Sequence, residues 1–170
     1  VWDPVAVEFC LTAGVGATIP LRFGGKAAST SGTPVDGEVT VLGAITVDGV
    51  IASLAVEGAT TTEVFGAFID QVVAPRLRPG NIVVLDNLSA HKAPSVQSAI
   101  EARGAHLVFL PPYSPDFSPI ELCWSKVKTL VRKFAARTRD ALIDGLADAL
   151  AQVCSRDARN WFNHCGYVAR

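Results

Sequence analysis

The stretch Ile82-Val83-Val84-Leu85-Asp86-Asn87 decides the expected fold of this chain. Its first four residues are apolar without alternation, which is typical of a parallel strand that is buried on both faces of a sheet. Ligands of α/β proteins bind just outside the carboxyl ends of such strands, and Asp86 lies at that point. The stretch therefore predicts a central strand that delivers a carboxylate to a functional edge. Asp86 and Asn87 are also common turn residues, so a purely structural role stays open.

Further strands and helices are expected on both sides of this stretch. Two runs rich in β-branched residues, 39–47 and 50–56, flank Asp48-Gly49, which is a strong signal for a hairpin turn. This order of elements predicts an α/β fold, a mixed sheet in which an antiparallel hairpin joins parallel strands, with helices on both faces. The other expected elements are a helix over 63–73 capped within 60–62, a helix from Pro94 to Gly104, a buried strand over 105–110, a helix from Pro119 with Trp124 and Phe134 facing the core, and helices over about 139–152 and 155–163.

Residues 1–37 are expected to be irregular, with one short strand over 5–11, because six glycines interrupt this part of the chain. The 170 residues fit a single domain, 1–170, and an apolar fraction of 49% with 18% charged residues is typical of a globular protein. A net charge of −1 argues against strong non-specific DNA binding by the whole surface.

The sequence also indicates a compartment. No apolar run reaches the roughly 18 residues of a membrane span, and the first residues do not resemble a signal peptide. The four cysteines are spread along the chain without a CxxC pair, which argues against a zinc site. Sparse cysteines of this kind are typical of reduced thiols, so we expect a cytoplasmic protein without a membrane partner.

Glu121 is the second carboxylate that stands out. Ser118-Pro119-Ile120-Glu121 has the form of a capping box, in which Ser118 begins a helix and Glu121 bonds back to it. A carboxylate in the first helical turn is also well placed to face the end of a strand. Asp86 and Glu121 are therefore candidate ligands of a divalent metal, which prefers such oxygen donors.

Several cations lie near these two acids. His91 and Lys92 follow Asp86, and His91 is interpreted either as a contact to phosphate or to a neighbouring carboxylate, or as a hydrogen-bonded structural histidine. A basic stretch begins one turn after Glu121, and its usual role is a solvated helix face. Its position also suits DNA phosphates. The candidate DNA-binding residues are His91, Lys92, Lys126, Lys128, Arg132 and Lys133.

Three segments carry a resemblance to a known family: VLDNLSAHK at 84–92, LPPYSPDFSPIE at 110–121 and WSKVK at 124–128. They closely resemble the DDE transposases of bacterial insertion sequences related to mariner elements, over roughly residues 38–169. The resemblance implies an RNase H-like catalytic domain whose three carboxylates bind two Mg²⁺ ions, with Mn²⁺ as a substitute. Asp86 would be the second carboxylate and Glu121 the third, and the 34 residues between them are a spacing that this group uses.

The implied function is Mg²⁺-dependent DNA cleavage and strand transfer at transposon ends, with double-stranded DNA as partner and homodimer formation left open. Two metal ions would activate the attacking group and stabilise the leaving oxygen. An unrelated phosphotransferase with Asp86 as nucleophile is a weaker alternative, because no second acid follows two residues later.

The sequence departs from the family in its first carboxylate. The family places an Asp-Glu pair at the end of the first strand, and no such pair precedes the hairpin here. Asp3 is the expected catalytic candidate and Glu8 a weaker one, whereas Asp36 lies too close to the hairpin. The helix-turn-helix domain of the family is expected to be absent as well. The alternative function is therefore a truncated or frameshifted, inactive remnant that folds and binds DNA or a partner.

Overall fold

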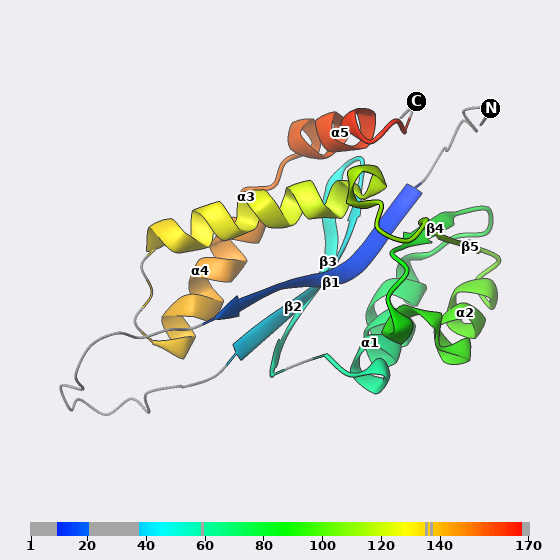
Figure 1. Ribbon diagram of the computed structural model, residues 1–170, viewed down its shortest axis with the longest axis horizontal. Coiled ribbons are helices and arrows are strands. Elements are labelled where there is room, and N and C mark those ends of the chain that lie inside the picture. The colour runs from blue at the N-terminus through cyan, green and yellow to red at the C-terminus, as the bar shows by residue number, and fades with distance from the viewer. Residues whose placement is uncertain (1–9, 21–37, 59, 135, 137, 168–170) are drawn as a thin grey trace.

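A computed structural model describes residues 10–20, 38–58, 60–134, 136 and 138–167, with the backbone alone for residues 10–20 and 38. These residues form a five-stranded sheet in the order β3-β2-β1-β4-β5 (Figure 1). The hairpin strands are antiparallel to each other and β2 is antiparallel to β1, whereas β1, β4 and β5 run parallel. This is the predicted mixed sheet. The strands are β1 (Cys10–Pro20), β2 (Glu38–Thr46), β3 (Gly49–Glu57), β4 (Ile82–Leu85) and β5 (His106–Phe109).

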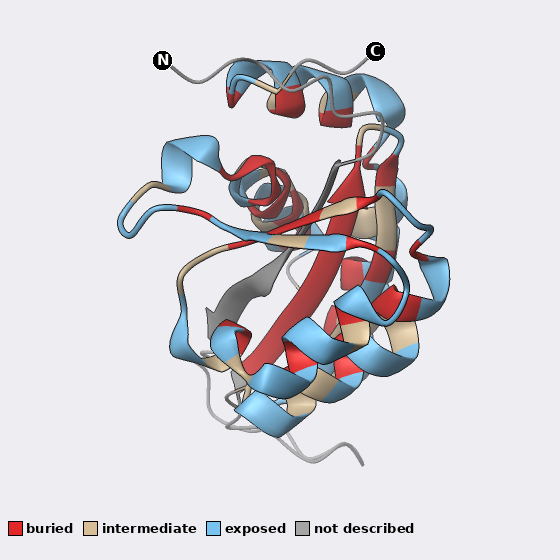
Figure 2. Ribbon diagram, turned by 90° about the vertical axis from the view of Figure 1, so that its right-hand side faces the viewer, coloured by how far each residue is buried: buried red, intermediate tan, exposed pale blue. Residues whose placement is uncertain are grey.

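Helices cover both faces of the sheet, as predicted. One face carries α1 (Thr62–Phe68), its continuation through a π turn (Ile69–Val73) and a 3-10 turn (Ala74–Arg76), and α2 (Pro94–Glu101). The opposite face carries α3 (Pro119–Phe134), α4 (Arg139–Ala151) and α5 (Ser155–His164). Figure 2 shows the buried sheet between helices whose outer surfaces are exposed. Two hydrophobic cores result, one on each side of the sheet.

β4 connects both cores. Val84 packs into the core under α3, whereas Val83 and Leu85 pack into the core under α1 and α2. All three side chains are buried, which confirms the prediction of an internal parallel strand. Because side chains alternate along a strand, Asp86 follows Val84 onto the α3 side, where the candidate site lies.

The expectation of an irregular segment within residues 1–37 is wrong for residues 10–20, and the rest of that segment, with most of the strand expected over 5–11, lies outside the described residues. β1 begins at Cys10 and continues to Pro20, passing through Gly14 and Gly16, where an irregular segment was expected. The strand pairs with β2 on one side and β4 on the other, so ladder hydrogen bonds outweigh the weak strand propensity of glycine. Its register with β2 shifts between Val15 and Thr18, around Gly16, as is common at a glycine in a strand.

Two smaller expectations also fail. β5 is an edge strand rather than a buried one, and its Val108 and Phe109 are exposed, because a strand at the edge has a neighbour on one side only. Phe134 is exposed at the end of α3, although Trp124 is buried as predicted. No helix among the described residues is long and apolar enough to cross a membrane. The described cysteines, Cys123, Cys154 and Cys165, are free thiols.

Candidate active site

Asp86 lies directly after β4, where a short turn holds its carboxylate. The Leu88 N–H donates a hydrogen bond to Asp86 Oδ1 over 3.1 Å. The 3-10 turn Ser89–Lys92 then brings His91 back, so that its Nδ1 contacts the same carboxylate oxygen. The Asp86 side chain remains 36% exposed. The turn therefore fixes the carboxylate without removing it from solvent.

The structure assigns His91 to the interior. Its imidazole is fully buried and stacks on Phe65, with ring centroids 4.0 Å apart and planes inclined by 29°. Nε2 has no hydrogen-bond partner among the described residues. The expected contact of His91 with DNA phosphate is therefore replaced by a contact with a carboxylate, because a fully buried ring has no surface for DNA.

Glu121 lies in the first turn of α3 with an exposed side chain. The predicted capping box is not formed, because the Ser118 N–H donates to the Pro115 carbonyl over 2.9 Å, as part of the 3-10 turn Pro115–Phe117. Among the residues that the structure describes, no side-chain hydrogen bond joins Ser118 and Glu121. The Glu121 carboxylate is therefore not needed to begin the helix.

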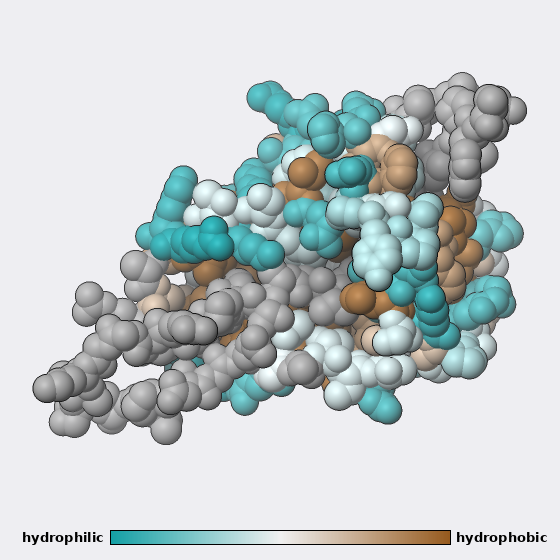
Figure 3. Space-filling view, in the orientation of Figure 1, coloured by the Kyte–Doolittle hydropathy of each residue, from teal (hydrophilic) through white to brown (hydrophobic). Residues whose placement is uncertain are grey.

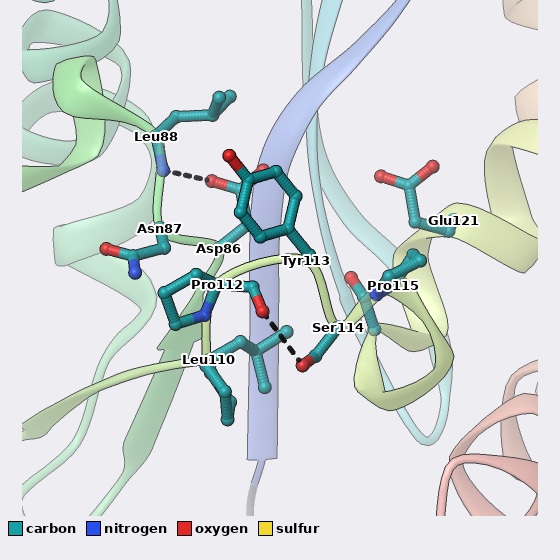
Figure 4. A pocket seen from close by; sticks show the side chains of 11 residues that line it. Asp86, Asn87, Leu88, Leu110, Pro112, Tyr113, Ser114, Pro115 and Glu121 are labelled. Atoms are coloured by element: carbon teal, nitrogen blue, oxygen red, sulfur yellow. Dashed lines mark hydrogen bonds between the residues drawn. The ribbon is translucent and has the colours of Figure 1, made fainter.

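Asp86 and Glu121 line one open pocket of about 390 Å³. Figure 4 shows them on opposite walls, Asp86 from the β4 end and Glu121 from the start of α3. The proline-rich loop between β5 and α3 forms the rest of the wall. The lining residues are Asp86, Asn87, Leu88, Leu110, Pro111, Pro112, Tyr113, Ser114, Pro115, Ser118 and Glu121.

The surroundings shift the pKa values of the two carboxyl groups in opposite directions. Burial raises the pKa of Asp86, but the His91 and Leu88 contacts outweigh it and hold the pKa below its usual range. Burial raises the pKa of Glu121, Lys128 opposes this, and the charge of Asp86 raises it further. Asp86 is therefore ionised at neutral pH, and Glu121 is the carboxylate whose ionisation a bound cation would favour.

The register of β1 shows what the neighbouring strand offers to this site. Ala13 pairs with Leu85, so the next residue along each strand places Gly14 level with Asp86. Gly14 also pairs with Gly43 of β2, where an added Cβ would meet the Trp124 indole of α3. This position therefore faces α3 but carries no carboxylate, and the whole of β1 contains no acidic residue. The candidates for the first carboxylate, Asp3 and Glu8, lie outside the described residues, as does Asp36.

The cations divide into two groups. Lys126 is engaged internally, since its ammonium donates to Asp157 over 2.6 Å and to the Gln152 carbonyl over 2.9 Å. The Lys126 ammonium, together with the hydrogen bonds from the Cys154 N–H and thiol, lowers the pKa of Asp157 to about 2. The remaining predicted DNA-binding cations, Lys92, Lys128, Arg132 and Lys133, have exposed or half-buried side chains. Hydrophilic side chains gather along the α3 and α5 side of the molecule in Figure 3.

A family model of DDE superfamily endonucleases matches residues 19–143, a span that includes both carboxylates. The chain belongs to the DDE superfamily endonucleases. Among curated proteins, a 44-residue match at 48% identity to microcystinase C of Sphingomonas sp covers 25% of the chain and 9% of that protein. Such a short match assigns no function to this DDE-family domain.

Solved structures agree with the RNase H-like fold expected for the family. The catalytic domain of Mos1 mariner transposase has a TM-score of 0.67 at 14% identity, covering 92% of this chain and 76% of that one. The Mos1 strand transfer complex has a TM-score of 0.66 at 16% identity, covering 94% of this chain and 52% of that one. This DDE-family domain therefore spans about half of the chain in that complex.

One part of the site was not predicted. Tyr113 was quoted only as part of a motif, yet the structure places its side chain on the pocket wall. The sequence signal was the density of prolines around it, which indicates a rigid loop rather than a flexible one.

Proposed function

We propose that this chain is the catalytic domain of an insertion-sequence transposase, which cleaves DNA at transposon ends and transfers the strand to target DNA. The observation that carries the proposal is the meeting of Asp86 and Glu121 across one open pocket within a DDE-family domain. The fold match to the catalytic domain and strand transfer complex of Mos1 supports it.

The donor set fits a magnesium ion. Mg²⁺ keeps several waters and is commonly bound by one or two carboxylates together with substrate phosphates. Asp86 and Glu121 would hold one such ion between them, which would activate the attacking hydroxyl and stabilise the leaving oxygen. Structures of the Mos1 catalytic domain with Mn and of the Mos1 paired-end complex with Mn support the use of a divalent metal. Among the described residues no group of three metal-binding side chains occurs, so the second expected ion needs a further ligand.

The residues of the chain have distinct tasks in this proposal. The Leu88 N–H and His91 hold Asp86 ionised and in one orientation, so its carboxylate is ready for a cation. Lys128 lies close enough to Glu121 to lower its pKa, and a cation at that distance also attracts a DNA phosphate. Double-stranded DNA is the proposed partner, and homodimer formation stays a prediction.

Cleavage of labelled transposon-end DNA in Mg²⁺ tests the proposal. Asp86→Ala and Glu121→Ala should each abolish cleavage, and Glu121→Ala should abolish Mn²⁺ binding measured by calorimetry. Asp116→Ala is the matched control, because Asp116 is an exposed acid near α3 that does not line the pocket. Cleavage that survives in Asp86→Ala would refute the assignment.

A second candidate function follows from the glycine at position 14, where the neighbouring strand could have carried a carboxylate. Because β1 brings no carboxylate to the level of Asp86, the chain also fits an inactive remnant that folds and binds DNA without cutting it. A folded protein that binds end DNA but shows no metal-dependent cleavage would establish this candidate. Loss of cleavage in Asp3→Ala would instead assign Asp3 as the first carboxylate.

A further inference from the structure

Tyr113 has an unusual backbone and an unusual exposure. Its φ is +57°, and it is the one non-glycine residue with a positive φ among those that the structure describes. A non-glycine residue pays roughly 1–2 kcal/mol for this left-handed conformation. Its side chain is completely exposed, at 102% of the reference value, so packing does not offset the strain. Strain that no contact compensates commonly marks a functional position.

The loop restrains the backbone that carries this exposed ring. Pro111 and Pro112 precede Tyr113 and Pro115 follows Ser114, so the backbone φ is fixed on both sides. The Ser114 hydroxyl donates to the Pro112 carbonyl over 3.3 Å and closes the turn around the tyrosine. A side chain with few rotatable bonds on a rigid turn loses little entropy when a ligand binds.

The ring also lies at a specific place. Tyr113 lines the same pocket as Asp86 and Glu121, and in the view of Figure 4 its ring overlaps the Asp86 carboxylate. Leu88, which also lines the pocket, is 48% exposed and adds apolar surface. A ligand of this pocket would therefore meet a flat apolar face beside two acids, with the cation Lys128 close to Glu121.

We propose that Tyr113 is a stacking site for an unpaired nucleobase next to the phosphate that a divalent cation at the Asp86–Glu121 pair would hold. This inference rests on the proposed function, which brings a DNA strand into the pocket. Bases inside a duplex already stack on both faces, so a free face is offered only by an unpaired or flipped base at the strand being processed. Every base has such a face, so the contact would be tolerant of sequence.

The expected contribution follows from stacking energies. One base on one aromatic side chain changes the dissociation constant roughly 5- to 150-fold. Tyr113→Gly removes the ring and relieves the strain, since glycine adopts φ near +57° freely. The variant should therefore fold with an unchanged or higher melting temperature, and Tyr113→Phe should retain the stacking.

The test compares three proteins, wild type, Tyr113→Phe and Tyr113→Gly, on two DNAs. A duplex with a short single-stranded overhang carries 2-aminopurine as its first unpaired base, and a second DNA is abasic at that position. Binding is measured by anisotropy in Ca²⁺, and stacking by quenching of the 2-aminopurine fluorescence. Wild type and Tyr113→Phe should quench the base. Tyr113→Gly should lose both the quenching and roughly 5- to 150-fold in affinity, and should not distinguish the two DNAs.

Each other outcome counts against the inference. If Tyr113→Gly binds and quenches like wild type, the stacking site is wrong while the proposed function stands. If the loss is equal for abasic DNA and Tyr113→Gly changes the mass in sedimentation, the ring contacts a second copy of the chain. If wild type binds neither DNA, both the proposed function and the stacking site fail. Phe109→Ala, which removes an exposed aromatic outside the pocket, should change none of these readings.

Discussion

Replacement of His91 by phenylalanine separates its contact with Asp86 from its role in packing. Phenylalanine keeps a ring against Phe65 and removes the nitrogen that contacts the carboxylate. The lost contact to a charged group costs about 1.5–3 kcal/mol. Removal of the buried, unpartnered Nε2 also removes its desolvation penalty, which is about 1–3 kcal/mol. We therefore expect the free energy of unfolding at neutral pH to change by less than about 2 kcal/mol, from the difference of these two terms.

The same replacement should raise the pKa of Asp86. Burial raises this pKa, and in the variant the Leu88 N–H opposes it without help from His91. A carboxyl whose folded pKa is lowered stabilises the protein above its unfolded pKa, and this contribution disappears as the pH falls through the folded pKa. His91→Phe should therefore lose more stability relative to wild type at pH 7 than near about pH 3.

Two measurements check this reasoning. A carbon-13 titration of the Asp86 carboxyl, assigned with Asp86→Asn, gives the pKa, and urea unfolding at the two pH values gives the stability. His91→Ala is the comparison, since loss of a fully buried ring should cost about 3–5 kcal/mol. An unchanged Asp86 pKa in His91→Phe would refute the role of His91. Equal destabilisation in the two variants would show that packing against Phe65 is not preserved.

Three further perturbations test the site and its support. Gly14→Asp should place a third carboxylate level with Asp86 and tighten Mn²⁺ binding about tenfold or more, measured by calorimetry. Gly14→Asn should increase the Mn²⁺ affinity less, and equal affinities of the two variants would contradict the strand register. Gly43→Ala should lower the free energy of unfolding by about 1–3 kcal/mol, because the new Cβ would lie 2.6 Å from Trp124, and an unchanged urea midpoint would contradict that contact. Lys126→Ala should raise the pKa of Asp157 from about 2 towards its ordinary value. Its cost should stay below about 1 kcal/mol at neutral pH, because the pair is partly exposed, and should vanish as the pH falls from about 4 to about 2.

The sequence predicted the elements whose signals are local. The hairpin around Asp48-Gly49 and the apolar run of β4 carry their information in adjacent residues, and both are confirmed. The path of β1 through Gly14 and Gly16 was missed, since it depends on pairing with β2 and with β4, which follows 62 residues after the end of β1. Exposure of β5 was missed for the same reason, because its place at the sheet edge is a property of the whole sheet.

The same distinction between local signals and long-range contacts applies to the site. The sequence located Asp86 and Glu121 but left a capping role for Glu121 open, because a capping box and a ligand have the same residues. The 3-10 turn decides the question, since it satisfies the Ser118 N–H with the Pro115 carbonyl. The burial of His91 was equally invisible, because it depends on Phe65, a residue of α1 that lies 26 positions earlier.

The opposite pKa shifts of the two carboxylates show how the site would respond to a cation. Asp86 is held ionised by neighbours that belong to its own turn, so it presents a negative charge whether or not a metal is present. For Glu121 the charge of Lys128 does not outweigh burial, and the charge of Asp86 also works against its ionisation. A divalent ion between them would remove this repulsion and lower the pKa of Glu121, so binding and deprotonation are coupled. A carboxylate at Gly14 would add a third negative charge to the same face, which is unfavourable without a cation and favourable with one. The described part of the chain brings two carboxylates to this proposed metal site, and such a site would tolerate the empty state better than one with three carboxylates but would bind the metal more weakly.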